Sequence, residues 1–128
     1  MQDCRKLAVR QNAHALTLRI YRCSERYPKD EFYGLTSQVR RAGGSIGANI
    51  VEGCGRGTGR DQLRLFQIAT GLIDETEYLL LLARDVKYIG ATAQGELAGS
   101  PSEVMAMHRT LLRLLRERVE RVSAGSTG

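Results

Sequence analysis

Residues 33–60, YGLTSQVRRAGGSIGANIVEGCGRGTGR, decide the fold that we predict for this 128-residue chain. Leu35, Val39, Ala42, Ile46 and Ile50 recur there every three or four residues, which is the spacing of one face of an amphipathic helix. The pattern predicts a helix over about residues 31–52, followed by a glycine-rich segment that we expect to leave the helix.

Four glycines interrupt this helix: Gly34, Gly43, Gly44 and Gly47. Each costs about 1 kcal/mol of helix propensity relative to alanine. Packing against other helices must therefore stabilise this one. Glycines at this spacing let a neighbouring backbone approach closely, so we expect a tight helix crossing, either within one chain or between subunits.

The same spacing predicts three more helices, over about residues 5–26, from the segment after Thr58 to about residue 88, and from Ser100 or Ser102 onward. Thr58 and Asp61 fit a capping box that opens the third helix. Residues 90–100 are predicted as a loop with one helical turn near 94–98, and residues 123–128 as a disordered tail. No stretch has the pattern of a strand. We expect one domain over residues 1–122, an all-α, up-down four-helix bundle.

The apolar stripes of the flanking helices are well defined. The first consists of Val9, Ala13, Leu16, Ile20, Cys23 and Tyr27; the third of Leu65, Ala69, Leu72, Thr76, Leu79, Ala83 and Val86; the fourth of Val104, His108, Leu111, Leu115, Val119 and Val122. Phe66, Ile73 and Leu80 widen the third stripe, and residues 78–83, YLLLLA, are apolar around nearly the whole helix. A helix that is apolar on several sides must be covered on several sides, which indicates a homo-oligomer.

The chain has 19 Lys and Arg against 14 Asp and Glu, and most of its basic residues are arginine. Arginine suits bidentate binding of phosphate or carboxylate. The nucleic-acid-binding residues that we predict are Arg40, Arg41, Arg56, Arg60 and Arg64. The glycine-rich segment beside the last three is either an anion site at a helix N-terminus or a loop that needs glycine to turn.

Three further sequence features bear on catalysis, metal binding and internal packing. Residues 43–47 match the GxSxG pattern of a hydrolase nucleophile, but Ser45 lies in a helical pattern with no strand before it, so we predict no enzyme. Neither histidine has a glutamate three residues before it, so no di-metal site and no cofactor are expected. Arg41, Ser45, Asn49 and Glu52 form a polar ladder along the second helix, interpreted as an internal hydrogen-bond and charge network.

The three cysteines lack CxxC spacing, and the longest apolar run, residues 78–83, is too short to span a membrane. The N-terminal residues have no hydrophobic signal core. These features predict a cytoplasmic protein with no membrane partner.

The sequence resembles the bacterial 23S rRNA intervening-sequence proteins. Their pattern YGLTSQLRRA..SI..NI.EG.GR is matched by residues 33–56, and their later IA.G...E.E by residues 68–77. The resemblance covers roughly residues 7–115. It implies a helical bundle that assembles as a ring, typically a homopentamer, and a kinship with accessory bundles that partner a reverse transcriptase and nucleic acid.

Two function classes follow. The first is a non-enzymatic oligomer that associates with structured, ribosomal RNA through arginine-rich surfaces. The alternative is a protein adaptor or scaffold that binds an acidic partner or a nucleic-acid-processing enzyme such as a reverse transcriptase. Phosphate binding would be strongly salt-dependent, which distinguishes the two.

Overall fold

The computed structural model describes residues 4–56, 59–90 and 100–127. Over these ranges the secondary structure is helical: α1 (Cys4–Ser24), the 3₁₀ helix η1 (Lys29–Glu31), α2 (Leu35–Cys54), α3 (Gly59–Asp85) and α5 (Ser100–Thr127). The described residues contain no strand, so the prediction of an all-α fold is confirmed. None of the helices in these ranges has both the length and the apolar character needed to cross a membrane.

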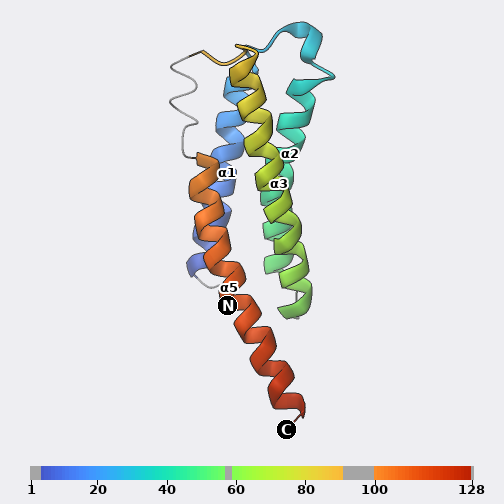
Figure 1. The fold of residues 1–128 in the computed structure, drawn as a ribbon, viewed down its shortest axis with the longest axis vertical. Coiled ribbons are helices and arrows are strands. Elements are labelled where there is room, and N and C mark those ends of the chain that lie inside the picture. The colour runs from blue at the N-terminus through green and yellow to red at the C-terminus, as the bar shows by residue number, and fades with distance from the viewer. Residues whose placement is uncertain (1–3, 57–58, 91–99, 128) are drawn as a thin grey trace.

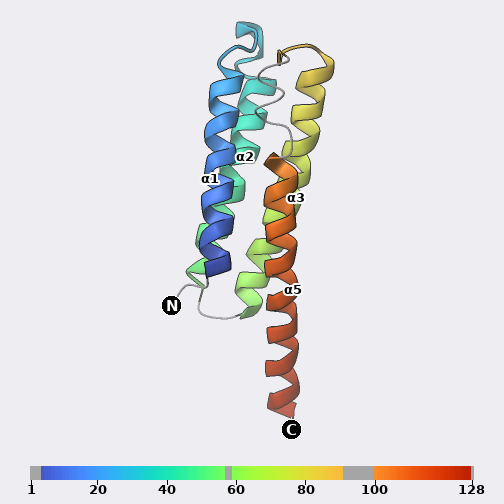
Figure 2. The ribbon, with the colours of Figure 1, turned by 90° about the vertical axis from the view of Figure 1, so that its left-hand side faces the viewer.

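Consecutive α-helices run in opposite directions and lie side by side (Figure 1). α2 packs against α1 and α3, and α5 packs against α3 and α1, so that each long helix contacts two others. α5 extends beyond the other helices at the end of the molecule that carries the C-terminus (Figures 1 and 2).

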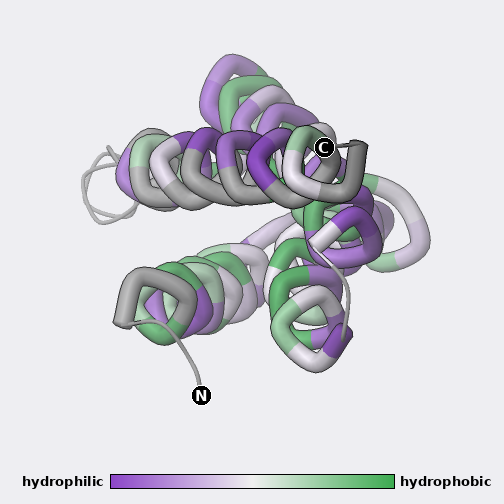
Figure 3. The backbone as a smooth tube through the Cα atoms, turned by 90° about the horizontal axis from the view of Figure 1, so that it is seen from below, coloured by the Kyte–Doolittle hydropathy of each residue, from purple (hydrophilic) through white to green (hydrophobic). Residues whose placement is uncertain are grey.

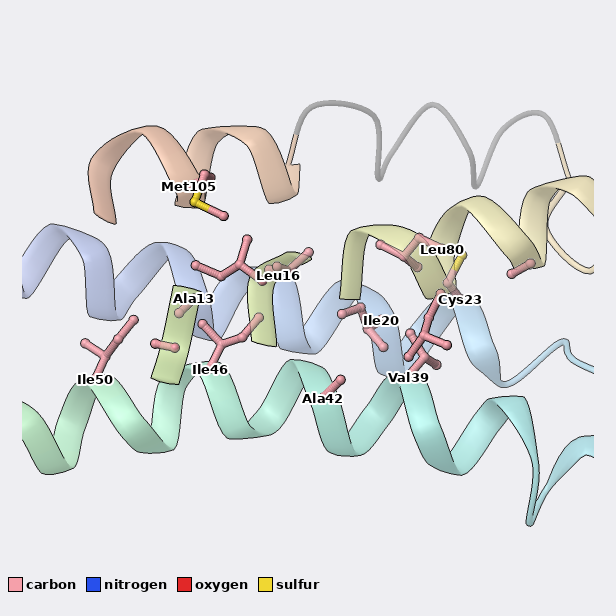
Figure 4. Packing of buried hydrophobic residues seen from close by; sticks show 14 of the residues in the cluster. Ala13, Leu16, Ile20, Cys23, Val39, Ala42, Ile46, Ile50, Leu80 and Met105 are labelled. Atoms are coloured by element: carbon pink, nitrogen blue, oxygen red, sulfur yellow. The ribbon is translucent and has the colours of Figure 1, made fainter. Parts of the chain in front are cut away.

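The core is built from the predicted stripes. The five residues of the first predicted stripe that lie on α1 are buried, and so is Tyr27, which follows the helix; on α2 the stripe residues from Leu35 to Gly53 are also buried. In Figure 4, Ala13, Leu16 and Ile20 of α1 lie opposite Ile46 and Ala42 of α2. Met105, on α5, lies above Leu16 in this view. Viewed end-on in Figure 3, hydrophobic and hydrophilic segments alternate along α1, as the periodicity predicts.

The start of α2, the end of α2 and the end of α5 differ from the predicted boundaries. Pro28 begins η1, and the backbone N–H of Gly34 bonds to the carbonyl of Glu31, so α2 starts at Leu35 rather than near residue 31. α2 also continues through Gly53 to Cys54, although we expected it to end before the first glycine of the exit segment. α5 includes residues 123–127, which we expected to be disordered. The predicted cap at Thr58 and helical turn near 94–98 lie outside the described residues.

Two glycines of α2 hold the helices close together. A Cβ atom at Gly43 would lie 2.8 Å from Cδ1 of Ile20 on α1, and one at Gly53 would lie 2.6 Å from Cε1 of Phe66 on α3. The Thr17 hydroxyl donates a hydrogen bond of 3.1 Å to the carbonyl of Gly43, which joins α1 to α2 at the same level. The predicted tight crossing therefore forms within the chain at these two positions.

We predict that Gly53→Ala lowers the free energy of unfolding by about 1–3 kcal/mol, because the new methyl group overlaps the buried ring of Phe66. Gly71→Ala on α3 is the control. Its Cβ would meet nothing within 4 Å, so the variant should gain about 1 kcal/mol from helix propensity. Urea denaturation of both variants measures the difference. Equal stability of the two would contradict a close approach of α2 and α3.

Candidate nucleic-acid interface

The five predicted arginines form two separate groups. Arg40 and Arg41 lie in the first half of α2. Arg56 lies two residues after the end of α2, and Arg60 and Arg64 lie in the first turns of α3. α2 has 20 residues, which corresponds to a length of about 30 Å. Most of that length separates the two groups, so the five side chains do not form one continuous patch.

Arg40 connects α2 to α1. Its Nε donates a hydrogen bond of 2.7 Å to the hydroxyl of Ser24, and its Nη2 donates one of 3.2 Å to the carbonyl of Tyr21. The guanidinium group also lies over the ring of Tyr21, with Cζ 4.8 Å from the ring centre. These contacts use donors that a phosphate would otherwise accept from, so we assign Arg40 to the packing of α1 and α2.

Arg41 is exposed and donates a hydrogen bond of 3.3 Å to the hydroxyl of Ser37, one turn earlier on α2. Asn49 donates a hydrogen bond of 2.8 Å to the backbone carbonyl of Ser45, and both side chains are half-buried. The internal network predicted for the polar ladder is therefore wrong for this chain. The bonds of Arg41 and Asn49 stay within α2, and the ladder lies on its partly exposed flank.

Arg56, Arg60 and Arg64 are exposed at the junction of α2 and α3. A guanidinium nitrogen of Arg56 lies 2.6 Å from a carboxylate oxygen of Glu52, in a pair that is about half exposed. Arg60 and Arg64 are one turn apart on α3, which places their side chains about 6 Å apart. The N-terminus of α3 adds its partial positive charge to this group.

α5 brings further arginines to the same end of the molecule. A Cβ atom at Gly59 would lie 3.1 Å from Cγ2 of Val119, so α5 passes beside the start of α3. Arg113 and Arg116 are exposed on α5 within two turns of Val119. We call the surface formed by Arg56, Arg60, Arg64, Arg113 and Arg116 the basic end. The sequence prediction did not include Arg113 and Arg116 among the nucleic-acid-binding residues, although their three-residue spacing places them on one face of a helix.

The hydrolase interpretation of Ser45 has no support in the geometry. Ser45 lies in the middle of α2 instead of at a turn between a strand and a helix. His108, the formal candidate for a base, is fully buried on α5 and its Nε2 bonds to the carbonyl of Phe66 on α3. Its Nδ1 is buried without a hydrogen-bond partner. Burial lowers the pKa of His108 below its usual value, so the neutral ring that donates to Phe66 is favoured.

Within the described residues, no group of three His, Cys, Asp or Glu side chains is arranged to hold a metal ion.

One sequence comparison and one structural comparison find proteins similar to this chain. A sequence model described as 23S rRNA-intervening sequence protein matches residues 5–110. A crystal structure from Bacteroides thetaiotaomicron VPI-5482, titled as a protein with unknown function from the S23 ribosomal protein family, superimposes with a TM-score of 0.77 at 23% sequence identity. The alignment covers 85% of this chain and 98% of that chain. This likeness shows a shared fold. A search of curated proteins finds no match.

We predict that Arg40→Ala lowers the free energy of unfolding by about 1–2 kcal/mol, because it removes two hydrogen bonds and a cation–π contact between α1 and α2. Arg41→Ala is the matched control and should change it by less than about 0.5 kcal/mol, as is usual at an exposed position. Thermal or urea unfolding measures both. A larger loss for Arg41→Ala than for Arg40→Ala would overturn the assignment.

The buried His108 predicts that stability falls in mild acid. Its pKa is lowered in the folded protein, so below pH 6.5 the unfolded chain binds a proton that the folded chain does not. The stability that the neutral ring contributes is complete above pH 6.5 and is lost as the pH falls from there toward the lowered pKa. Urea midpoints between about pH 7.5 and 5.5 should show this loss.

His108→Gln should flatten that profile, whereas His14→Gln, at an exposed position of α1, should leave it unchanged. If wild type and His108→Gln have parallel profiles over this range, His108 is not the group responsible.

Proposed function

The chain belongs to the 23S rRNA-intervening sequence protein family, and on this premise we propose that it is a non-enzymatic oligomer that binds structured RNA, with ribosomal RNA as the first candidate. We further propose that its helices form an up-down four-helix bundle and that copies of it assemble into a ring, most simply a pentamer. The family name indicates RNA as the ligand, and the exposed arginines of this chain provide the groups that would contact its phosphates.

The observation that carries the proposal is the basic end. Its five arginines come from three segments of the chain that the fold brings to one end. Exposed carboxylates at Glu52, Asp61, Glu117 and Glu120 offset four of these five positive charges, which leaves a net charge of +1 on the residues named. Arginine guanidinium groups bind phosphate oxygens with paired hydrogen bonds, and such contacts need clustered charge rather than a particular base sequence.

The positions of the exposed aromatic side chains, away from the basic end, favour recognition of the RNA backbone over stacking on its bases. Tyr33 and Phe32 are 91% and 56% exposed, but they lie before α2, at the end of that helix opposite to Arg56. Among the described residues, the basic end itself has no exposed aromatic residue on which unpaired bases could stack. We therefore propose binding to folded RNA through its shape and phosphates.

Assembly is supported by apolar side chains on the outside of α3. Ile68, Tyr78 and Leu81 on α3 and Val86, just after its last residue, are between 42% and 60% exposed. A ring would present several basic ends at once, so that weak single contacts combine into stronger binding.

We predict tight binding to a structured rRNA fragment, weaker binding to a DNA duplex of equal length, and affinity that falls steeply with salt. Arg60→Ala/Arg64→Ala should weaken RNA binding and reduce the slope of log affinity against log salt by about 1.5, because each phosphate contact contributes about 0.7–0.9. Fluorescence anisotropy at several salt concentrations measures both quantities.

Arg22→Ala/Arg26→Ala is the matched control, since it removes the same charge from exposed positions near the end of α1. It should leave the slope near the wild-type value. Equal effects of the two double variants would show that only net charge matters. Absence of binding at physiological salt would contradict the RNA proposal and favour an acidic protein partner.

A further inference from the structure

An open groove of about 390 Å³ lies between α1 and α2. Leu7 and His14 line it from α1, and Gly44, Gly47, Ala48 and Val51 line it from α2. Neither the basic end nor the core packing uses this groove.

The glycines of the groove differ from those of the core. A Cβ atom at Gly53 would overlap the ring of Phe66, and one at Gly43 would displace the terminal methyl group of Ile20. A Cβ atom at Gly44 or Gly47 would meet nothing within 4 Å. Each of these two glycines still costs about 1 kcal/mol relative to alanine in a helix. Packing within one chain does not explain them, but an occupant that comes close to the α2 backbone would.

The surroundings of the groove are apolar and basic. Leu7, Leu18 and Tyr21 are between 42% and 47% exposed along the outer side of α1, and Val51 is 49% exposed on α2. Arg10 also lines the groove, beside His14. An occupant should therefore carry an apolar or aromatic anchor with carboxylates next to it.

The outer face of α3 has this composition. Tyr78 is 60% exposed and Leu81, one turn later, is 42% exposed. Asp74 and Glu75, one turn before Tyr78, are exposed carboxylates. Residues three and four apart are neighbours on a helix surface, so these four side chains form one acidic and apolar patch, which we call the Tyr78 patch.

We infer that the α1–α2 groove of one copy receives the Tyr78 patch of a second copy. Tyr78 supplies the aromatic anchor over Gly44 and Gly47, and Asp74 and Glu75 face Arg10. Groove and patch are different surfaces of the same chain, so the contact is head-to-tail. Contacts of this kind close into a ring or continue as a filament. The inference deepens the assembly part of the proposed function and rests on it.

The test is mass measurement by light scattering at micromolar concentration. Wild type should have a multiple of the 14.2 kDa chain mass. Gly47→Phe should reduce it to the single-chain mass, because the ring fills the groove. The single chains should keep their helical circular dichroism, because a Cβ atom there meets nothing within 4 Å. Tyr78→Glu, at an exposed position, should have the same effect from the other side of the contact. Ala106→Phe, exposed on α5, is the control for added bulk and should assemble normally.

Mixing the two disrupted variants tests the head-to-tail geometry. Gly47→Phe retains an intact Tyr78 patch and Tyr78→Glu retains an intact groove, so together they should form a dimer and nothing larger. A Gly47→Phe variant that still assembles would overturn the groove while leaving assembly in place. A wild-type protein of single-chain mass would overturn the inference and the proposed ring. The RNA titration is a separate measurement, and neither of these mass results decides whether the protein binds RNA.

Discussion

The close approach of α2 to α1 at Gly43 and to α3 at Gly53 is the packing constraint that links the helices of this structure. Only at these positions does α2 come close enough to Ile20 and Phe66 that a single added carbon would overlap them. The close approach places Thr17 within hydrogen-bonding distance of the Gly43 carbonyl and brings Phe66 into the core. Phe66 in turn offers its carbonyl to His108, which fixes α5 against α3. These contacts therefore connect α1, α2, α3 and α5 in one continuous series of packing interactions.

Hydrophobic periodicity was sufficient to predict the helices and most of the faces they bury, although Val86, the last residue of the predicted third stripe, is 45% exposed. The stripe from Leu35 to Ile50 is buried, and so is that from Val9 to Tyr27. The helix ends were predicted less well, because local propensity was outweighed by packing. Gly53 remains helical because its missing side chain makes room for Phe66. At the N-terminal side of α2, a 3₁₀ turn after Pro28 takes the place of the first predicted turn.

The candidate site could be predicted only in part. Arg56, Arg60 and Arg64 lie close together because a short connection joins α2 to α3, which the sequence already suggested. Arg40 and Arg41 are adjacent in sequence, yet Arg40 binds Ser24 and Tyr21 while Arg41 stays exposed. Which of two neighbouring arginines joins the packing depends on the position of α1 and leaves no signal in the sequence. The contribution of α5 also depends on tertiary register, through the contact of Val119 with Gly59.

The central proposal is that RNA binds the basic end. Ultraviolet crosslinking of the assembled protein to structured rRNA, followed by mass spectrometry of the crosslinked peptides, tests this most directly. The account predicts crosslinks concentrated in residues 56–64 and 109–121, at the start of α3 and along α5. Crosslinks concentrated in residues 22–33, at the opposite end, would contradict it.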